Sequence, residues 1–153
     1  MTLEELEQDA LKRNIPVMQK EGILFLIEQL QERKATSCLE IGSAIGYSAM
    51  MMTTHVEHLC VETIELDEQR YLEAVGHIHE HGLEKRITIY HDDALTFQTD
   101  KLQFAPYDCL FIDAAKAQYQ KFFEKYVPFV KKNGIIIVCL LYTSDAADEA
   151  RSV

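Results

Sequence analysis

The chain lacks the features that mark membrane, secreted and nucleic-acid-binding proteins. Its longest apolar run, residues 134–142, is too short to span a bilayer, and its acidic N-terminus has no apolar signal core. Lys and Arg number 15 against 25 Asp and Glu, so the net charge is -10. This charge predicts no overall attraction to nucleic acid or to an anionic membrane. Composition therefore favours a cytoplasmic protein without a membrane partner.

Paired cysteines and the dinucleotide glycine pattern are also missing. The four cysteines are far apart and form no C-x-x-C pair. The first three, Cys38, Cys60 and Cys109, lie in or near apolar runs, which predicts buried free thiols in a reducing compartment. No G-x-G-x-x-G occurs, which argues against a dinucleotide such as NAD. With 153 residues, 48% of them hydrophobic, the chain is long enough for one domain with a core.

The most informative segment that is present covers residues 39–48. Glu40, Gly42 and Gly46 are spaced E-x-G-x-x-x-G, after a short apolar run and before a segment with helical character. A strand that turns through two glycines exposes backbone N–H groups beside the N-terminus of a helix. This arrangement suits the polar end of a nucleotide-like cofactor.

Apolar periodicity predicts helices that alternate with short strands. Helices are expected at residues 2–13, with Thr2 as N-cap, and at 22–32, 47–54, 67–81 and 118–130. Strands are expected at residues 37–41, 59–64, 87–90, 108–112 and 134–138. The strands are apolar and do not alternate with polar residues, which is typical of a parallel sheet covered on both faces. Four aromatic residues of the last helix are expected to face the core: Phe122, Phe123, Tyr126 and Phe129.

An acidic residue ends each of the first four expected strands. Ligands of such sheets bind outside the carboxyl ends of the strands, where the strand order reverses. Glu40 and Glu65 end the first two strands, and the Glu65 carboxylate suits either two ribose hydroxyls or a helix N-terminus. Asp93 suits either an adenine amino group or an N-cap position.

Asp113 ends the fourth strand and is followed three residues later by Lys116. A carboxylate at this place suits a hard-metal ligand, a general base or a turn residue. Lys116 is within reach of the same pocket, and positive charge nearby would let its amine accept a proton. The alternative for Lys116 is a solvent-exposed helix lysine.

The segments 39–48, 63–65, 93–95 and 111–119 together resemble the motifs of a known enzyme family. They are similar to those of metal-dependent O-methyltransferases of the catechol and caffeoyl-CoA type, which are class I enzymes that use S-adenosylmethionine. Residues 15–19 and 111–119 most resemble the branch that methylates 5-hydroxyuridine at the tRNA wobble position to 5-methoxyuridine. The resemblance implies a Rossmann-like methyltransferase fold, with a mostly parallel sheet and helices on both faces. It also implies a homodimer for the full-length protein.

The resemblance assigns one group of residues to the methionine part of the cofactor. Met18 and Ser48 would contact that part, and Glu40 and Gly42 would line it. These assignments apply only where the chain matches the motif of the family.

A second group would hold the adenosine part and perform the chemistry. Glu65 would bind the ribose, and Asp93 with Ala94 would bind the adenine. Asp113 would bind Mg²⁺ beside the cofactor, and Lys116 has the position of the general base. A metal ion in that place lowers the pKa of the substrate hydroxyl and aligns it for attack on the methyl group.

The chain departs from this family after residue 138. The metal site of the family needs an Asp-Asn pair directly after the fifth strand, where this chain has Cys139 and Leu140. Residues 139–149 resemble the reading-frame translation of a transposon adapter used in sequencing libraries. We therefore expect a methyltransferase domain at 1–138, truncated after the fifth strand, and a non-native tail at 139–153. Asp113 alone would coordinate Mg²⁺ poorly, so this chain is expected to be an inactive fragment with an uncovered sheet edge.

Three other functions stay open on the sequence. A catechol-type O-methyltransferase for small molecules is favoured by the acidic charge, whereas the segments around residues 18 and 117–119 favour tRNA. A non-catalytic module that only binds the cofactor is a second alternative, and a dehydrogenase is disfavoured by the glycine spacing. Asp92 stands where the tRNA branch usually has glycine, which affects the expected adenine site.

Overall fold

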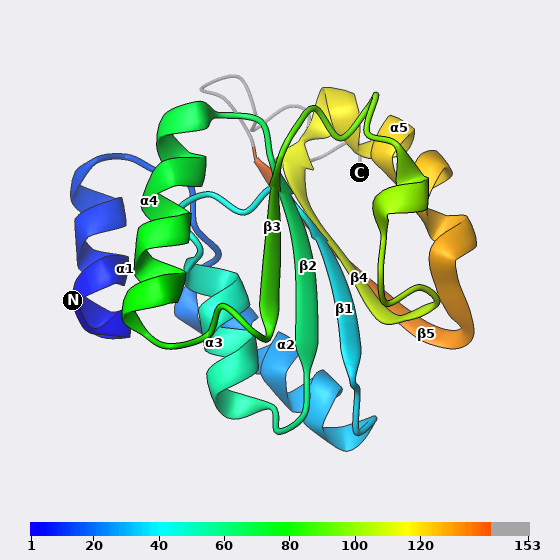
Figure 1. The fold of residues 1–153 in the computed structure, drawn as a ribbon, viewed down its shortest axis with the longest axis horizontal. Coiled ribbons are helices and arrows are strands. Elements are labelled where there is room, and N and C mark those ends of the chain that lie inside the picture. Colours follow the sequence, from blue (N-terminus) through cyan, green and yellow to red (C-terminus); the bar gives the residue numbers. More distant parts are fainter. Residues whose placement is uncertain (142–153) are drawn as a thin grey trace.

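An open five-stranded sheet with helices on both sides forms the molecule (Figure 1). The computed structural model describes residues 1–141, without the side chains of residues 114–116 and 140–141. The elements along the chain are α1 (Leu3–Lys12), α2 (Lys20–Glu32), β1 (Ser37–Ile41), α3 (Tyr47–His55), β2 (Cys60–Glu65), α4 (Glu68–Glu80), β3 (Ile87–His91), the 3-10 turn η1 (Thr99–Lys101), β4 (Tyr107–Ala115), α5 (Lys116–Tyr126), the 3-10 turn η2 (Val127–Phe129) and β5 (Val130–Leu141).

The strands lie in the order β3-β2-β1-β4-β5, and all four pairings are parallel. The chain builds outward from β1 through β2 to β3 and then returns to the other side of β1 with β4 and β5. The strand order therefore reverses between β1 and β4, and connections that leave these two strands in opposite directions open a crevice at their carboxyl ends. This topology confirms the predicted fold class.

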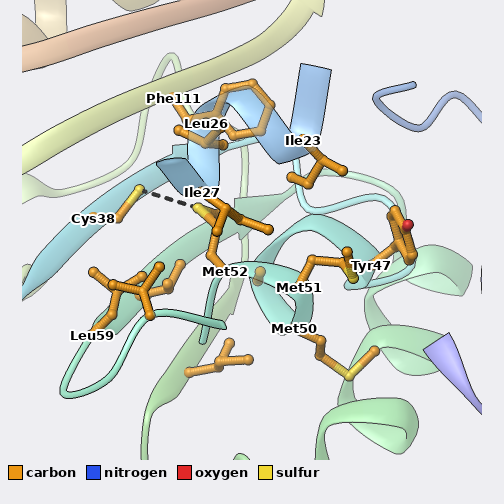
Figure 2. Close-up of a cluster of buried hydrophobic side chains, with 14 of the residues drawn as sticks. Ile23, Leu26, Ile27, Cys38, Tyr47, Met50, Met51, Met52, Leu59 and Phe111 are labelled. Carbon is orange, nitrogen blue, oxygen red and sulfur yellow. Dashed lines mark hydrogen bonds between the residues drawn. The ribbon is translucent and has the colours of Figure 1, made fainter. Parts of the chain in front are cut away.

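Helices α1 to α4 cover one face of the sheet (Figure 1). Figure 2 shows part of this core, where side chains of α2 and α3 gather around Cys38 of β1 and Phe111 of β4. Met52 is fully buried, and its Sδ atom lies 3.9 Å from Cys38 Sγ. Each fully buried side chain of this size contributes about 1.5–3 kcal/mol. Cys38 and Cys109 are buried free thiols as predicted, whereas Cys60 is free but only half-buried.

The opposite face packs against α5 and the segment between β3 and β4. Its core contains the buried rings of Tyr107 and Tyr126. A fully buried carboxylate, Glu62 of β2, lies within this face and binds four donors. It accepts hydrogen bonds from the hydroxyls of Tyr90 (2.6 Å) and Tyr107, and from the N–H groups of Gln103 (3.0 Å) and Phe104 (2.9 Å). The network ties β2, β3, β4 and the intervening loop together.

Two helix starts agree with the sequence. The hydroxyl of Thr2 accepts a hydrogen bond from the N–H of Glu5 (3.1 Å), which confirms the predicted cap. The carboxylate of Asp67, the first residue of the helix expected at 67–81, accepts one from the N–H of Arg70 (2.9 Å). The predicted helix at 118–130 is wrong at both ends, because α5 begins at Lys116 and ends at Tyr126. Pro128 has no N–H to continue an α-helix, and a 3-10 turn takes over.

The last two strands are longer than predicted. The pairing jumps from Tyr107–Val130 to Cys109–Ile135, so residues 131–134 form an irregularity within β5. The apolar run restarts only after this irregularity, which explains why the pattern predicted a strand at 134–138. β5 continues through Cys139 to Leu141, and residues 142–153 of the expected tail lie outside the described residues. Among the described helices, none is both long and apolar enough to cross a membrane.

Candidate functional site

A pocket of about 210 Å³ lies at the carboxyl ends of the strands, at the crevice where the strand order reverses. Its wall is formed by the ends of β1, β2 and β4, by the segment that follows β3 and by one face of α5. The lining residues are Pro16, Ile41, Gly42, Ala44, Ile64, Glu65, Leu66, Arg70, Asp92, Asp93, Ala94, Asp113, Gln118 and Phe122. The pocket is where a parallel sheet of this order is expected to bind a ligand.

Gly42 brings the backbone of β1 against β4. Its φ is +96°, and a Cβ atom built on it would overlap the carbonyl oxygen of Asp113. The Gly42 N–H also donates to the carbonyl of Ile64 (2.9 Å), so three strand ends meet at this residue. Only glycine combines this φ with so close an approach.

Glu65 organises the turn that follows β1. Its side chain is 7% exposed and lines the pocket. Oε1 accepts a hydrogen bond from the N–H of Ala44 (2.7 Å), and Oε2 accepts one from the N–H of Asp67 (3.0 Å). Because each carboxylate oxygen has two lone pairs, Glu65 retains acceptor capacity toward the pocket.

Glu40 lies beneath the pocket and is fully buried. Its carboxyl accepts hydrogen bonds from the hydroxyls of Ser48 and Thr63 (2.7 Å for Thr63). Burial raises the pKa of Glu40 to about 7, whereas the two hydroxyls lower it and the charges of Asp113 and Glu65 raise it further. Glu40 therefore retains a proton at a pH where an exposed glutamate is ionised.

Asp113 adds a third carboxylate at the end of β4. Burial raises its pKa to about 7, and the charge of Glu65 adds to that effect. Its Oδ1 atom is buried and has no hydrogen-bond partner among the described residues. Among the described side chains that line the pocket, Arg70 is the one cationic residue. Three converging carboxylates make this pocket suitable for a positively charged group.

Asp93 and Ala94 form the wall that follows β3. Asp93 Oδ1 accepts a hydrogen bond from the N–H of Leu95 (2.9 Å). The neighbouring Asp92 also lines the pocket, and its Oδ1 accepts from the N–H of Asp93 (2.7 Å). The Asp92 carboxylate thus holds the start of this segment.

Five of the residues expected from the sequence line this pocket, whereas Glu40, Met18 and Ser48 do not. Met18 packs against the start of α2, with its Cγ and Cε atoms 3.1 Å from where a Cβ of Gly22 would lie. Ser48 reaches the site only through its hydrogen bond to Glu40. Lys116 is the first residue of α5, and its side chain lies outside the described ones.

The sequence interpretation missed several lining residues. Gln118 and Phe122 lie one turn apart on α5, and Gln118 Oε1 is buried without a partner among the described residues. Their i, i+4 spacing shows that they share one helix face, but it does not indicate what that face contacts. Pro16 and Arg70 also line the pocket. Their presence depends on how the segments after α1 and β2 pack, which no local pattern encodes.

The described residues do not fit the magnesium site implied by the resemblance. They contain no cluster of three or more His, Cys, Asp or Glu side chains that would hold a metal ion. Cys139 pairs with Asp113 in the β4–β5 register, at a place where Mg²⁺ would need oxygen ligands. Burial raises the pKa of the Cys139 thiol to about 11, so it stays neutral at pH 7.

Sequence comparison identifies relatives of the chain. A profile of the O-methyltransferase family matches residues 1–148. A caffeoyl-CoA O-methyltransferase from Stellaria longipes is 26% identical over 117 residues, which cover 73% of this chain and 47% of that protein. The chain spans about half the length of the curated relatives it matches.

Structure comparison identifies the same kind of protein. A proposed caffeoyl-CoA O-methyltransferase from Staphylococcus aureus matches with a TM-score of 0.84 and 32% identity, over 90% of this chain and 66% of that one. The O-methyltransferase from Bacillus cereus, solved in complex with S-adenosylhomocysteine, matches with a TM-score of 0.78 and 27% identity. That match covers 89% of this chain and 64% of the B. cereus chain.

Proposed function

The chain belongs to the O-methyltransferase family, and from this premise we propose that its pocket binds S-adenosylmethionine for methyl transfer to an acidic hydroxyl group. The observation that carries the proposal is the convergence of Glu40, Glu65 and Asp113 around Gly42. S-adenosylmethionine, when bound, supplies a methyl group on a positively charged sulfur. The carboxylates attract that charge because burial excludes the water that would screen it.

Different residues around the pocket would bind the ribose, the base and the methionine part of this cofactor. Glu65 has free acceptor capacity for the ribose hydroxyls, and the segment Asp93–Ala94 faces the base. Gly42 lets the end of β1 pack against the Asp113 carbonyl, which brings the Asp113 and Glu65 strand ends together at the pocket. Met18 and Ser48, which the resemblance assigns to the methionine part, contribute from outside the wall. Ser48 acts by holding Glu40.

Proton removal from the acceptor is assigned to Lys116. It is the first residue of α5, three residues after Asp113, and directly follows the carboxyl end of β4. Its Nζ atom would accept the hydroxyl proton. Among the described residues Asp113 is the only member of the expected Mg²⁺ ligand set, so the proposed reaction has no step that uses Mg²⁺.

Two acceptor classes fit an acidic hydroxyl. The segments at residues 15–19 and 111–119 support 5-hydroxyuridine at the tRNA wobble position. The net charge of -10 and the named relatives, which include a caffeoyl-CoA O-methyltransferase, support a small phenol of the catechol type. The homodimer implied by the resemblance remains a prediction, and light scattering would test it.

Calorimetric titration of the chain with S-adenosylmethionine tests the cofactor proposal. Saturable binding is expected, and Glu65→Gln should weaken it by about tenfold because one charged acceptor is lost. Glu68→Gln is the matched control, since Glu68 lies three residues later, is exposed and begins α4. Absence of binding, or equal losses in both variants, would contradict the proposed pocket.

Radiolabelled methyl transfer then separates the acceptors. The chain is incubated with labelled S-adenosylmethionine and either tRNA that contains 5-hydroxyuridine or a small catechol, with Mg²⁺ and with EDTA. Label on only one acceptor identifies the substrate class. Cofactor binding without label on either acceptor is the result expected for an inactive fragment, and label on either one would contradict that expectation.

A further inference from the structure

The peptide bond between Ala94 and Leu95 is held from both sides. The carbonyl of Ala94 accepts hydrogen bonds from Lys125 Nζ (2.9 Å) and from the Tyr126 hydroxyl (2.6 Å), both at the end of α5. The N–H on the other side of this peptide, from Leu95, donates to Asp93 Oδ1 (2.9 Å). Since a peptide unit is planar, the donors that fix the carbonyl also fix the direction of the N–H.

The Tyr126 contact is buried, and the Lys125 and Leu95 contacts are partly buried. Tyr126 is fully buried, and Ala94 is 6% exposed. The two donors use both lone pairs of the Ala94 carbonyl. Lys125 Nζ donates as well to the carbonyl of Phe97 (2.8 Å), so the charged end of α5 spans the segment that follows Asp93. Donors on a carbonyl polarise its peptide and strengthen the hydrogen bond that the N–H makes.

The same segment forms one wall of the pocket. Asp93 and Ala94 line it, as do Gln118 and Phe122 from the first half of α5. Asp93 Oδ1 is engaged by Leu95, whereas Oδ2 has no hydrogen bond among the described residues. Helix α5 thus lines the pocket with its first half and holds the Asp93–Ala94 wall with its last turn.

We propose that Lys125 and Tyr126 are positioning residues that orient the Asp93 carboxylate toward the amino group of the adenine base. This inference rests on the proposed function, in which Asp93 faces the base. Without the donors from α5, the Ala94–Leu95 peptide rotates and Asp93 Oδ1 loses its N–H partner. The carboxylate then loses a fixed orientation, and recognition of the base amine weakens more than the rest of cofactor binding does.

Base selectivity measures this orientation directly. Dissociation constants are determined by calorimetry for S-adenosylhomocysteine and S-inosylhomocysteine, in which a carbonyl oxygen replaces the amine. The unsubstituted chain should prefer the adenine ligand, and Tyr126→Phe should lower that preference by about threefold to tenfold, the range of one hydrogen bond. Asp93→Asn should lower it as well. A loss of global stability weakens the binding of both ligands equally and leaves the ratio of their dissociation constants unchanged.

Matched variants separate positioning from stability. Tyr107→Phe also removes a buried tyrosine hydroxyl, but far from the base, and should lower the melting temperature without changing the ratio. Lys125→Met keeps the apolar stem and should lower the ratio, whereas Lys121→Met at an exposed place on α5 should not. Lys125→Met also carries the test if Tyr126→Phe does not fold.

The outcomes distinguish this inference from the function on which it rests. An unchanged ratio in Tyr126→Phe and Lys125→Met, with a lowered ratio in Asp93→Asn, overturns the positioning role and leaves the proposed function intact. An unchanged ratio in Asp93→Asn overturns the base contact, and no binding by the unsubstituted chain overturns the proposed function itself.

Discussion

Protonation of Glu40 should make the stability of the unliganded chain depend on pH. The carboxyl is fully buried, and its pKa is raised from 4.5 to about 7, mainly by burial. The folded state therefore binds this proton more tightly than the unfolded state does. The resulting stabilisation is fully present below pH 4.5 and is lost as the pH rises through about 7.

The size of the effect follows from the two pKa values. Their difference corresponds to about 3 kcal/mol, since one pKa unit equals 1.36 kcal/mol. Of this amount, about 2 kcal/mol should disappear between pH 5.5 and pH 8, because half-ionisation of the folded carboxyl falls inside that interval. Asp113, whose pKa burial also raises to about 7, should add a loss in the same direction.

Urea unfolding followed by far-UV circular dichroism at the two pH values tests this expectation. Glu40→Gln cannot ionise, and its amide can accept from one of the Ser48 and Thr63 hydroxyls and donate to the other. Between pH 5.5 and pH 8, the free energy of unfolding of the variant should therefore fall by about 2 kcal/mol less than that of the parent. Glu28→Gln, at an exposed position of α2, is the control and should behave as the parent does. An equal loss in Glu40→Gln and in the parent would refute the reasoning.

Three further substitutions test the fold and the site. Glu62→Gln should lower the free energy of unfolding in urea by about 2 kcal/mol, because a buried donor then faces an amide NH₂; an unchanged value would contradict the four-donor network. Gly42→Ala should abolish calorimetric binding of S-adenosylhomocysteine because its Cβ would overlap the Asp113 carbonyl, whereas Gly76→Ala, which has open space around it, should bind normally. Thr2→Ala should cost about 1 kcal/mol in the same urea titration through loss of the N-cap, and no loss would argue against that cap.

The sheet and the acidic strand ends were predictable because their signals are local. Short apolar runs identify buried parallel strands, and the residue that follows each run therefore lies at the carboxyl end of a strand. Glu65, Asp93 and Asp113 therefore reach the pocket as expected, and Gly42 has the positive φ that its turn requires. The parallel arrangement brings these separate segments together without any further information.

The rest of the site depends on packing between elements. Phe122 was assigned to the core, yet it lines the pocket as well as packing on the core, and it shares this helix face with Gln118. The hydroxyl of Tyr126 reaches Ala94 across 32 residues, a contact that apolar periodicity does not report. The bounds of β5 were missed for a related reason, since its pairing to β4 continues on both sides of an irregularity.

The pocket acids place stability and binding in opposition. Glu40, Glu65 and Asp113 repel one another, and burial raises the pKa of two of them toward neutrality, so the empty pocket destabilises the fold at neutral pH. A bound cation reverses both effects, and the free energy it restores appears as ligand affinity. A sulfonium cofactor has that positive charge, whereas the thioether left after methyl transfer does not. The same carboxylates are therefore expected to favour the cofactor over its product, and the preference should increase as the pH rises through 7 and the acids ionise.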